Sequence, residues 1–147
     1  MIHELEKMCQ QRDFDITVAE DIISKINVNQ VFPSSEYCLD TTLLSCAAEG
    51  ANYKMVELLL KHGADPNLIY DNETENVLWD LQYSEDNTDE NETRLRIVKL
   101  LLDYGANPLL KLEGEELYHW VTACWQDDMG VQADYRSKYI DLLEKYL

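Results

Sequence analysis

Residues 54–67 read KMVELLLKHGADPN, and residues 96–108 read RIVKLLLDYGANP. The two stretches align without a gap, and their glycines, Gly63 and Gly105, lie 105 − 63 = 42 positions apart. In each stretch the apolar residues recur at the spacing of one helical face. A Gly that can adopt the left-handed conformation then ends the helix, and a Pro that cannot continue it follows. The sequence therefore predicts a repeated unit built around an amphipathic helix.

A second, shorter helix is expected before each of these stretches. Residues 42–48 read TLLSCAA, and the paired alanines would let a neighbouring helix come close. Residues 76–79 read NVLW and take the same place in the later copy. More residues separate the two helices in the later copy, which predicts an insert in the acidic stretch 84–92, whose charges we expect to be solvated. Each unit is thus a helix, a turn, a helix and a loop.

This unit resembles the ankyrin repeat, whose pattern is T-P-L-H-x-A-A followed by V-V-x-L-L-L-x-x-G-A-x-x-N over about 33 residues. Thr42 and Leu44 fall on the Thr and Leu of that pattern, and the register then runs without a gap to Asn67. A weaker copy is found near the C-terminus, where residues 116–119 read ELYH and residues 139–143 read YIDLL. At the N-terminus, two short helices are expected over 5–11 and 17–25.

The resemblance implies an all-α fold, an ankyrin-repeat solenoid of about three to four stacked helix-turn-helix units that include atypical end repeats. A single domain would then span 1–147. The expected units are an N-terminal capping repeat at 1–40, a repeat at 41–74, a repeat at 75–113 with the insert at 84–92, and a C-terminal capping repeat at 114–147 with an insert at 126–134.

The chain is strongly acidic, with a formal net charge of −17 from 29 acidic and 12 basic residues. A field of this sign repels nucleic acid and anionic membranes and attracts basic proteins. No stretch of about 18 apolar residues and no signal-peptide pattern occurs, so we expect a cytoplasmic protein without a membrane partner. The four cysteines show no C-x-x-C spacing, which favours free thiols over a metal site.

The sequence carries no sign of catalytic chemistry. It lacks the phosphate-binding loop, the dinucleotide fingerprint, the zinc-protease helix and the nucleophile elbow. The acidic residues 86–90 do not follow the frame of a calcium loop. We therefore predict that the protein is not an enzyme and has no catalytic residues, cofactor or metal.

The resemblance implies a concave face, formed by the loop tips and the first helix of each unit, that meets another protein. Counted in register, Cys46, Asp80 and Trp120 form one rung across this face. Two roles suit Trp120 equally well: a hot spot for binding the partner, and a cap on the hydrophobic core of the last unit. In the loop 68–75, Tyr70 supplies apolar area among acids, a combination that suits Lys and Arg on a partner. The predicted partner-binding residues are Cys46, Tyr70, Asp71, Glu73, Glu75, Asp80, Glu116 and Trp120.

A short acidic chain with this repeat resembles the ankyrin-type immunity proteins that accompany bacterial toxins and cover the toxin's active site. A nuclease toxin must be basic to hold phosphates, so an acidic inhibitor is steered to the same surface. The hypothesis is thus a monomer that binds a basic protein such as a nuclease toxin. The alternatives are a general scaffold or adaptor, and a regulatory subunit or metal-binding protein that uses the acidic loops.

Overall fold

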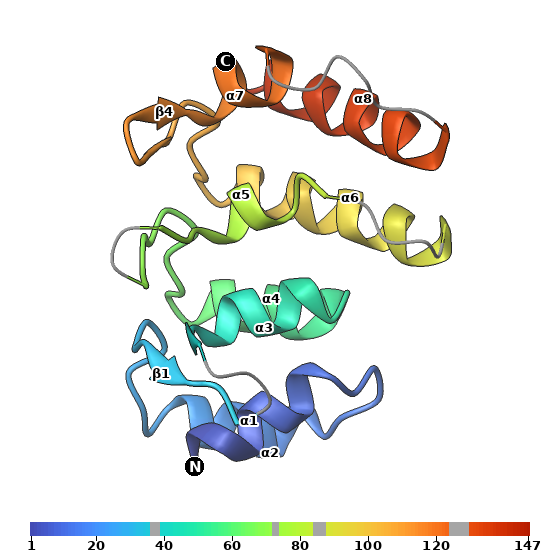
Figure 1. Ribbon diagram of the computed structural model, residues 1–147. Helices are drawn as coiled ribbons and strands as arrows, with labels where there is room; N and C mark the ends of the chain where they lie inside the picture. Colours follow the sequence, from blue (N-terminus) through green and yellow to red (C-terminus); the bar gives the residue numbers. More distant parts are fainter. Residues whose placement is uncertain (36–38, 72–73, 84–87, 124–129) are drawn as a thin grey trace.

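The computed structural model describes residues 1–35, 39–71, 74–83, 88–123 and 130–147. Their helices follow one another in pairs that lie one above another from the N- to the C-terminus (Figure 1). The first helices of the first three pairs pack on one another in sequence, and the second helices do so from the second pair onward. The pairs are α1 (Ile2–Cys9) with α2 (Ile16–Ile23), α3 (Leu43–Glu49) with α4 (Tyr53–Lys61), α5 (Val77–Asp80) with α6 (Thr88–Asp103), and α7 (Leu117–Ala123) with α8 (Gly130–Glu144).

Short β-hairpins stand at the loop tips, on one side of the stack, where the sequence predicted only loops. β1 (Phe32–Pro33) pairs antiparallel with β2 (Asp40–Thr41), and β3 (Lys111–Leu112) pairs antiparallel with β4 (Glu115–Glu116). Between them, Tyr70 and Glu75 form an isolated antiparallel bridge. The all-α expectation missed these pairings because two residues cannot show the alternation that identifies a strand.

The ends of the helices follow the predicted signals. Thr42 precedes α3, and its hydroxyl accepts a hydrogen bond from the Ser45 amide at 3.2 Å. After α4 and α6, Gly63 and Gly105 have φ angles of 93° and 95°, the left-handed conformation that glycine adopts without strain. The helix-ending role predicted for the two glycines is therefore confirmed.

An asparagine at the end of one unit is bonded to the turn of the next. Asn29 Nδ2 donates to the Gly63 carbonyl at 3.1 Å, and its Oδ1 accepts from the Asp65 amide at 2.8 Å. Asn67 repeats the arrangement with the Gly105 carbonyl at 2.9 Å and the Asn107 amide at 2.7 Å. Because the same two bonds recur, they set the same spacing between successive turns.

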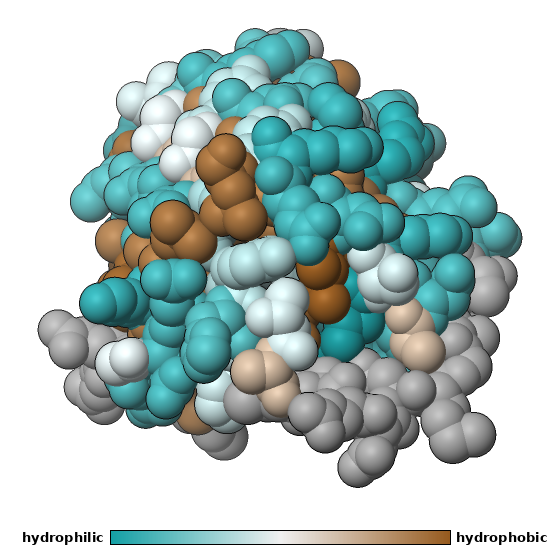
Figure 2. Space-filling model, turned by 90° about the horizontal axis from the view of Figure 1, so that it is seen from above, coloured by the Kyte–Doolittle hydropathy of each residue, from teal (hydrophilic) through white to brown (hydrophobic). Residues whose placement is uncertain are grey.

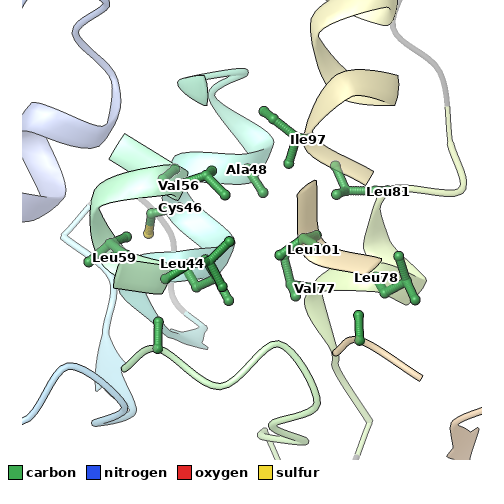
Figure 3. Close-up of a cluster of buried hydrophobic side chains, with 14 of the residues drawn as sticks. Leu44, Cys46, Ala48, Val56, Leu59, Val77, Leu78, Leu81, Ile97 and Leu101 are labelled. Carbon is green, nitrogen blue, oxygen red and sulfur yellow. The ribbon is translucent and has the colours of Figure 1, made fainter. Parts of the chain in front are cut away.

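The core lies between the layers of helices. Figure 3 shows the junction between the second and third pairs, where Leu44, Ala48 and Val56 face Leu81 and Ile97 across a buried apolar interface. The end of the stack formed by α7 and α8 is largely hydrophilic, with apolar side chains in small groups (Figure 2). This outer surface suits a terminal unit, which meets water instead of another pair.

The described parts of the predicted inserts belong to helices. Residues 84–87 and 126–129 lie outside the described residues, but 88–92 form the first turns of α6 and 130–134 those of α8. Within 88–92, Asp89 and Glu92 are exposed and Glu90 is half-buried, whereas the uncharged Asn91 is buried. Asp89 and Glu90 stand in the first turn of α6, where carboxylates favour the helix because they face its positive end.

Candidate functional site

Two adjoining clefts open on the hairpin side of the molecule. The Tyr70 cleft has a volume of about 260 Å³ and is lined by Glu6, Gln10, Ser34, Leu39, Asp40, Thr41, Cys46, Glu49, Tyr70, Asp71 and Glu75. The Trp120 cleft has a volume of about 300 Å³ and is lined by Thr74, Glu75, Trp79, Asp80, Gln82, Tyr83, Leu112, Glu113, Glu115 and Trp120.

The two clefts share Glu75 and together form what we call the acidic groove. The described residues that line the groove contribute eight carboxyl side chains and no Lys, Arg or His. A concave wall of one charge sign focuses the field on whatever enters it, because the protein beneath it has a low dielectric constant. The groove is therefore suited to a cationic ligand.

A buried polar cluster joins the two clefts. The Tyr70 hydroxyl donates to Ser45 Oγ at 2.6 Å and approaches Asp80 Oδ2 at 3.3 Å. Burial raises the pKa of Asp80 well above its usual value, and the neighbouring Glu75 adds to the effect. Burial likewise raises the pKa of Tyr70. At neutral pH, Asp80 therefore holds its proton in the folded chain.

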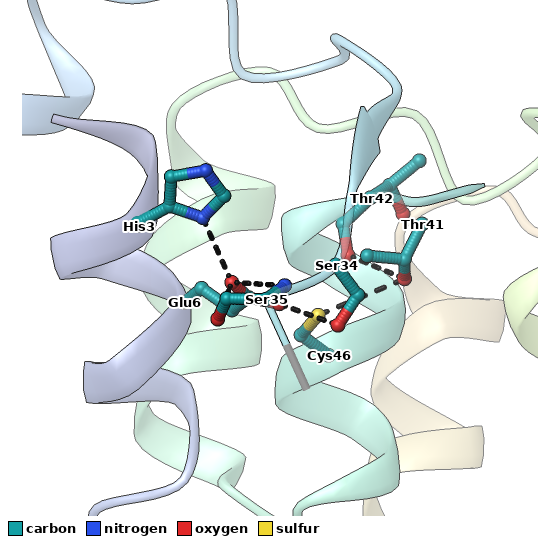
Figure 4. Close-up of polar contacts among 7 residues, drawn as sticks. All are labelled: His3, Glu6, Ser34, Ser35, Thr41, Thr42 and Cys46. Atoms are coloured by element: carbon teal, nitrogen blue, oxygen red, sulfur yellow. Dashed lines mark hydrogen bonds and ion pairs between the residues drawn. The ribbon is translucent and has the colours of Figure 1, made fainter. Parts of the chain in front are cut away.

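Glu6, which belongs to α1 and is only 3% exposed, holds the β1 end of the groove together. Its carboxylate accepts hydrogen bonds from Ser34 Oγ at 2.7 Å, from Ser35 Oγ at 2.7 Å and from the Ser35 amide at 3.2 Å (Figure 4). His3 Nδ1 lies 3.0 Å away. Burial alone would raise the pKa of Glu6, but the bonds from Ser35, His3 and Ser34 outweigh burial and lower it to about 2.

Glu6→Gln is expected to lower the free energy of unfolding by about 2 kcal/mol at pH 7, because the new amide group turns donors toward the two serines. The folded pKa of Glu6 lies below the usual 4.5, so its stabilisation is complete above about pH 4.5 and is lost as the pH falls toward 2. Urea unfolding at pH 7, 4.5 and 3 should therefore show a difference that shrinks with acid. Glu4→Gln, on an exposed position of the same helix, should change stability by less than about 0.5 kcal/mol.

Seven of the eight residues predicted for the binding face lie in the described part of the chain, and six of these line the groove. Asp71 and Glu75 are half-buried at the Tyr70–Glu75 bridge, and Asp80 and Trp120 lie in the Trp120 cleft. Cys46 and Tyr70 line the Tyr70 cleft but are largely buried. Glu116 lies in β4 and lines neither cleft, and Glu73 is outside the described residues. The geometry gathers the predicted rung and loop on one face.

Sequence reasoning missed several lining residues, most clearly the Glu113–Glu115 turn. Glu113 has a φ of 52° and Asp71 a φ of 55°, and the two lie 113 − 71 = 42 positions apart, the same separation as the repeated glycines. Extending that register to the loops would have identified Glu113. Glu6, Asp40 and Gln82 carry no comparable signal, because only the packing of distant segments brings them to the groove.

Other kinds of site find no support in the described part of the chain. No group of three or more His, Cys, Asp and Glu side chains there has the arrangement needed to hold a metal ion. Among the same residues, every helix is too short or too polar to span a lipid bilayer.

Comparison with curated proteins finds no match for the chain. Residues 40–71 match the family model of the ankyrin repeat. The matched range contains α3, α4 and the loop that leads to Tyr70, so it includes one wall of the groove. The ankyrin repeat is a non-catalytic fold that binds other proteins. Residues 40–71 are therefore similar to one ankyrin repeat, a unit that binds other proteins.

Proposed function

We propose that the four helix pairs are four ankyrin repeats, at 1–40, 41–74, 75–113 and 114–147, and that their acidic groove binds a basic protein. The observation that carries the proposal is the lining of the groove, with its eight carboxyl side chains and no basic one among the described residues. Carboxylates held close together repel one another, and a cationic partner reduces this repulsion when it binds. The partner-binding set predicted from the sequence, which adds Glu73 and Glu116 to residues of the groove, is part of this proposal: Cys46, Tyr70, Asp71, Glu73, Glu75, Asp80, Glu116 and Trp120.

We propose further that the basic partner is a toxin domain and that the protein is its cytoplasmic immunity protein. A domain that cleaves nucleic acid needs a positive surface around its active site. The net charge of −17 would steer the protein toward that surface, where its acidic groove would exclude the substrate. The support for this step is charge complementarity together with the resemblance to ankyrin-type immunity proteins.

The experiment that tests the toxin hypothesis uses the protein encoded by the neighbouring gene. If that gene encodes a toxin with a basic terminal domain, the purified domain should lose its activity when one equivalent of the ankyrin protein is added. A neighbour without toxic activity, or full toxin activity in the presence of excess ankyrin protein, contradicts the immunity role. Binding of the neighbour without inhibition would instead favour a general adaptor.

The association rate with a basic partner should fall about tenfold or more between 50 mM and 300 mM salt, because salt screens long-range steering. The double variant Glu113→Lys with Glu115→Lys reverses two exposed charges in the groove and should slow association about tenfold. Stopped-flow fluorescence would measure both effects. As a matched control, Asp13→Lys with Glu20→Lys makes the same change in net charge at exposed positions outside the groove. Equal slowing by both variants would mean that the groove is not the binding surface.

A further inference from the structure

The Trp120 cleft differs from the Tyr70 cleft because it contains two tryptophan rings. α5 supplies Trp79 and α7 supplies Trp120, and the ring centroids lie 6.2 Å apart with a tilt of 41°. Trp79 is buried, and its Nε1 donates to the Leu110 carbonyl at 3.3 Å. Trp120 is only half-buried. Trp79 therefore supports Trp120 from one side, and the cleft exposes part of the Trp120 ring.

Carboxyl groups surround this ring in the cleft. Asp80 and Glu75 lie on the α5 side, and Glu113 and Glu115 are exposed in the β3–β4 turn. An aromatic face attracts a cation through its quadrupole, and nearby carboxylates strengthen the attraction. The cleft thus combines the two features that hold a positively charged side chain.

A third feature is independent of charge. Gln82 lines the Trp120 cleft and is only 2% exposed. Its Nε2 donates to the Trp79 carbonyl at 2.9 Å, which fixes the orientation of the amide because a flipped oxygen would face another acceptor. Its Oε1 is buried and accepts no hydrogen bond from any residue that the structure describes. A buried acceptor without a donor costs free energy that a ligand donor would recover.

We propose that the Trp120 cleft receives an arginine side chain of the bound protein, whose guanidinium stacks on Trp120 and donates to Gln82 Oε1 and to the carboxylates of the cleft. The inference rests on the proposed function, because it names the group by which the basic partner is recognised. The volume of about 300 Å³ accommodates such a side chain.

Arginine fits these features better than lysine. A guanidinium is planar, so it can lie flat on an indole ring while its five N–H groups point outward to separate acceptors. An ammonium is a compact and more strongly hydrated charge that cannot stack in this way.

The chain itself places Arg136 over the Tyr83 ring, 5.9 Å from its centroid. The ring offered to the partner is therefore Trp120 and not Tyr83.

Titration of the whole protein with three blocked peptides tests the proposal. The peptides are acetyl-Gly-Arg-Gly-amide, its lysine analogue and its citrulline analogue, which keeps the shape of arginine without the charge. The indole N–H signals of the three tryptophans serve as the readout in NMR spectra, with Trp120 assigned by its loss in Trp120→Leu. We expect the arginine peptide to shift the Trp120 signal, the lysine peptide to bind at least about threefold more weakly, and the citrulline peptide to bind least. An unshifted Trp120 signal, or equal affinity for arginine and citrulline, would overturn the proposal.

Two variants each remove one feature of the Trp120 cleft. Trp120→Leu removes the stacking surface, and Gln82→Leu removes the acceptor while keeping an apolar side chain of similar length. Each should weaken the arginine peptide about 5- to 10-fold, whereas Glu20→Gln, an exposed change outside the groove, should leave its affinity unchanged. Circular dichroism checks that each variant folds. If Gln82→Leu does not fold, Trp120→Leu and the citrulline comparison decide the outcome alone.

The same variants distinguish this inference from the proposed function. If a basic partner protein binds wild type and Trp120→Leu equally well, with the expected salt dependence, the arginine site is wrong and the acidic groove stands. If the arginine peptide binds at Trp120 but the basic partner is insensitive to Glu113→Lys with Glu115→Lys, the arginine site stands and the proposed mode of binding is wrong.

Discussion

Asn76→Ala is expected to lower the free energy of unfolding by about 4 kcal/mol, as measured by urea denaturation at pH 7. Asn76 is fully buried before α5 and uses both ends of its amide. Its Oδ1 accepts from the Leu78 and Trp79 amides at 2.9 and 3.3 Å. Its Nδ2 donates to the Pro66 and Leu68 carbonyls at 3.1 and 3.0 Å. Alanine would leave these groups without partners where water does not reach them.

Two further substitutions divide this loss into its parts. Asn76→Ser keeps an acceptor for the amides of α5 but cannot reach the two carbonyls, so it should recover about 1 kcal/mol of the loss. Asn67→Ala is the matched control, because Asn67 also bonds a distant turn through both ends of its amide, but at a more exposed position. Water can replace those bonds, and the expected loss is about 1 kcal/mol. Equal losses for Asn76→Ala and Asn67→Ala would mean that burial of Asn76 adds nothing.

Asp80→Asn is expected to stabilise the protein by about 2 kcal/mol at pH 8 and to change its stability little at pH 5. Because the folded state raises the pKa of Asp80, the carboxyl keeps its proton in the folded chain at a pH where the unfolded chain has lost it. Stability contributed by this group therefore falls as the pH rises above about 4. Asparagine imitates the protonated carboxyl, since its amide can donate to Glu75 and its oxygen can accept from Tyr70.

Thermal or urea unfolding of Asp80→Asn and wild type at pH 5, 6.5 and 8 measures this effect. Glu113→Gln serves as the control, because it removes an exposed carboxylate from the same cleft and should change stability by less than about 0.5 kcal/mol at each pH. A difference between wild type and Asp80→Asn that is constant with pH would show that Asp80 is ionised in the folded state. If Asp80→Asn also weakens partner binding, the carboxyl group of Asp80 contributes to recognition of the partner although it lowers the stability of the fold.

The helical repeats could be predicted because their signals are local. The stretches 54–67 and 96–108 contain the apolar face, the left-handed glycine and the proline within a few turns of each other, and the structure places α4 and the C-terminal part of α6 there. Thr42 and Asn76 were likewise aligned from the sequence, and both accept hydrogen bonds at the start of a helix. The extension of α6 toward residue 88 was not predicted, because its polar residues lack an apolar stripe.

The groove could be predicted where it repeats the same register and where the loop 68–75 lines it. Cys46, Asp80 and Trp120 were placed on one face because each follows the same position of its unit. The contact between Tyr70, Ser45 and Asp80 was not predicted, since it joins a loop to α3 and α5. From the sequence, Tyr70 was expected to contact the partner instead. The carboxylate of Glu6 was missed for the same reason, because its serine partners lie 28 and 29 positions away.

The asparagine bonds that link one turn to the next have a consequence for how the molecule opens. Asn29 and Asn67 each reach the adjacent turn, and among the residues that the structure describes no bond of this kind joins the first pair of helices directly to the last. An end pair can then detach while the middle pairs stay closed. Amide hydrogen exchange should accordingly be slowest in α4 and in the C-terminal half of α6, and faster in α2. The central units would keep their shape while the ends adjust to the surface of a partner.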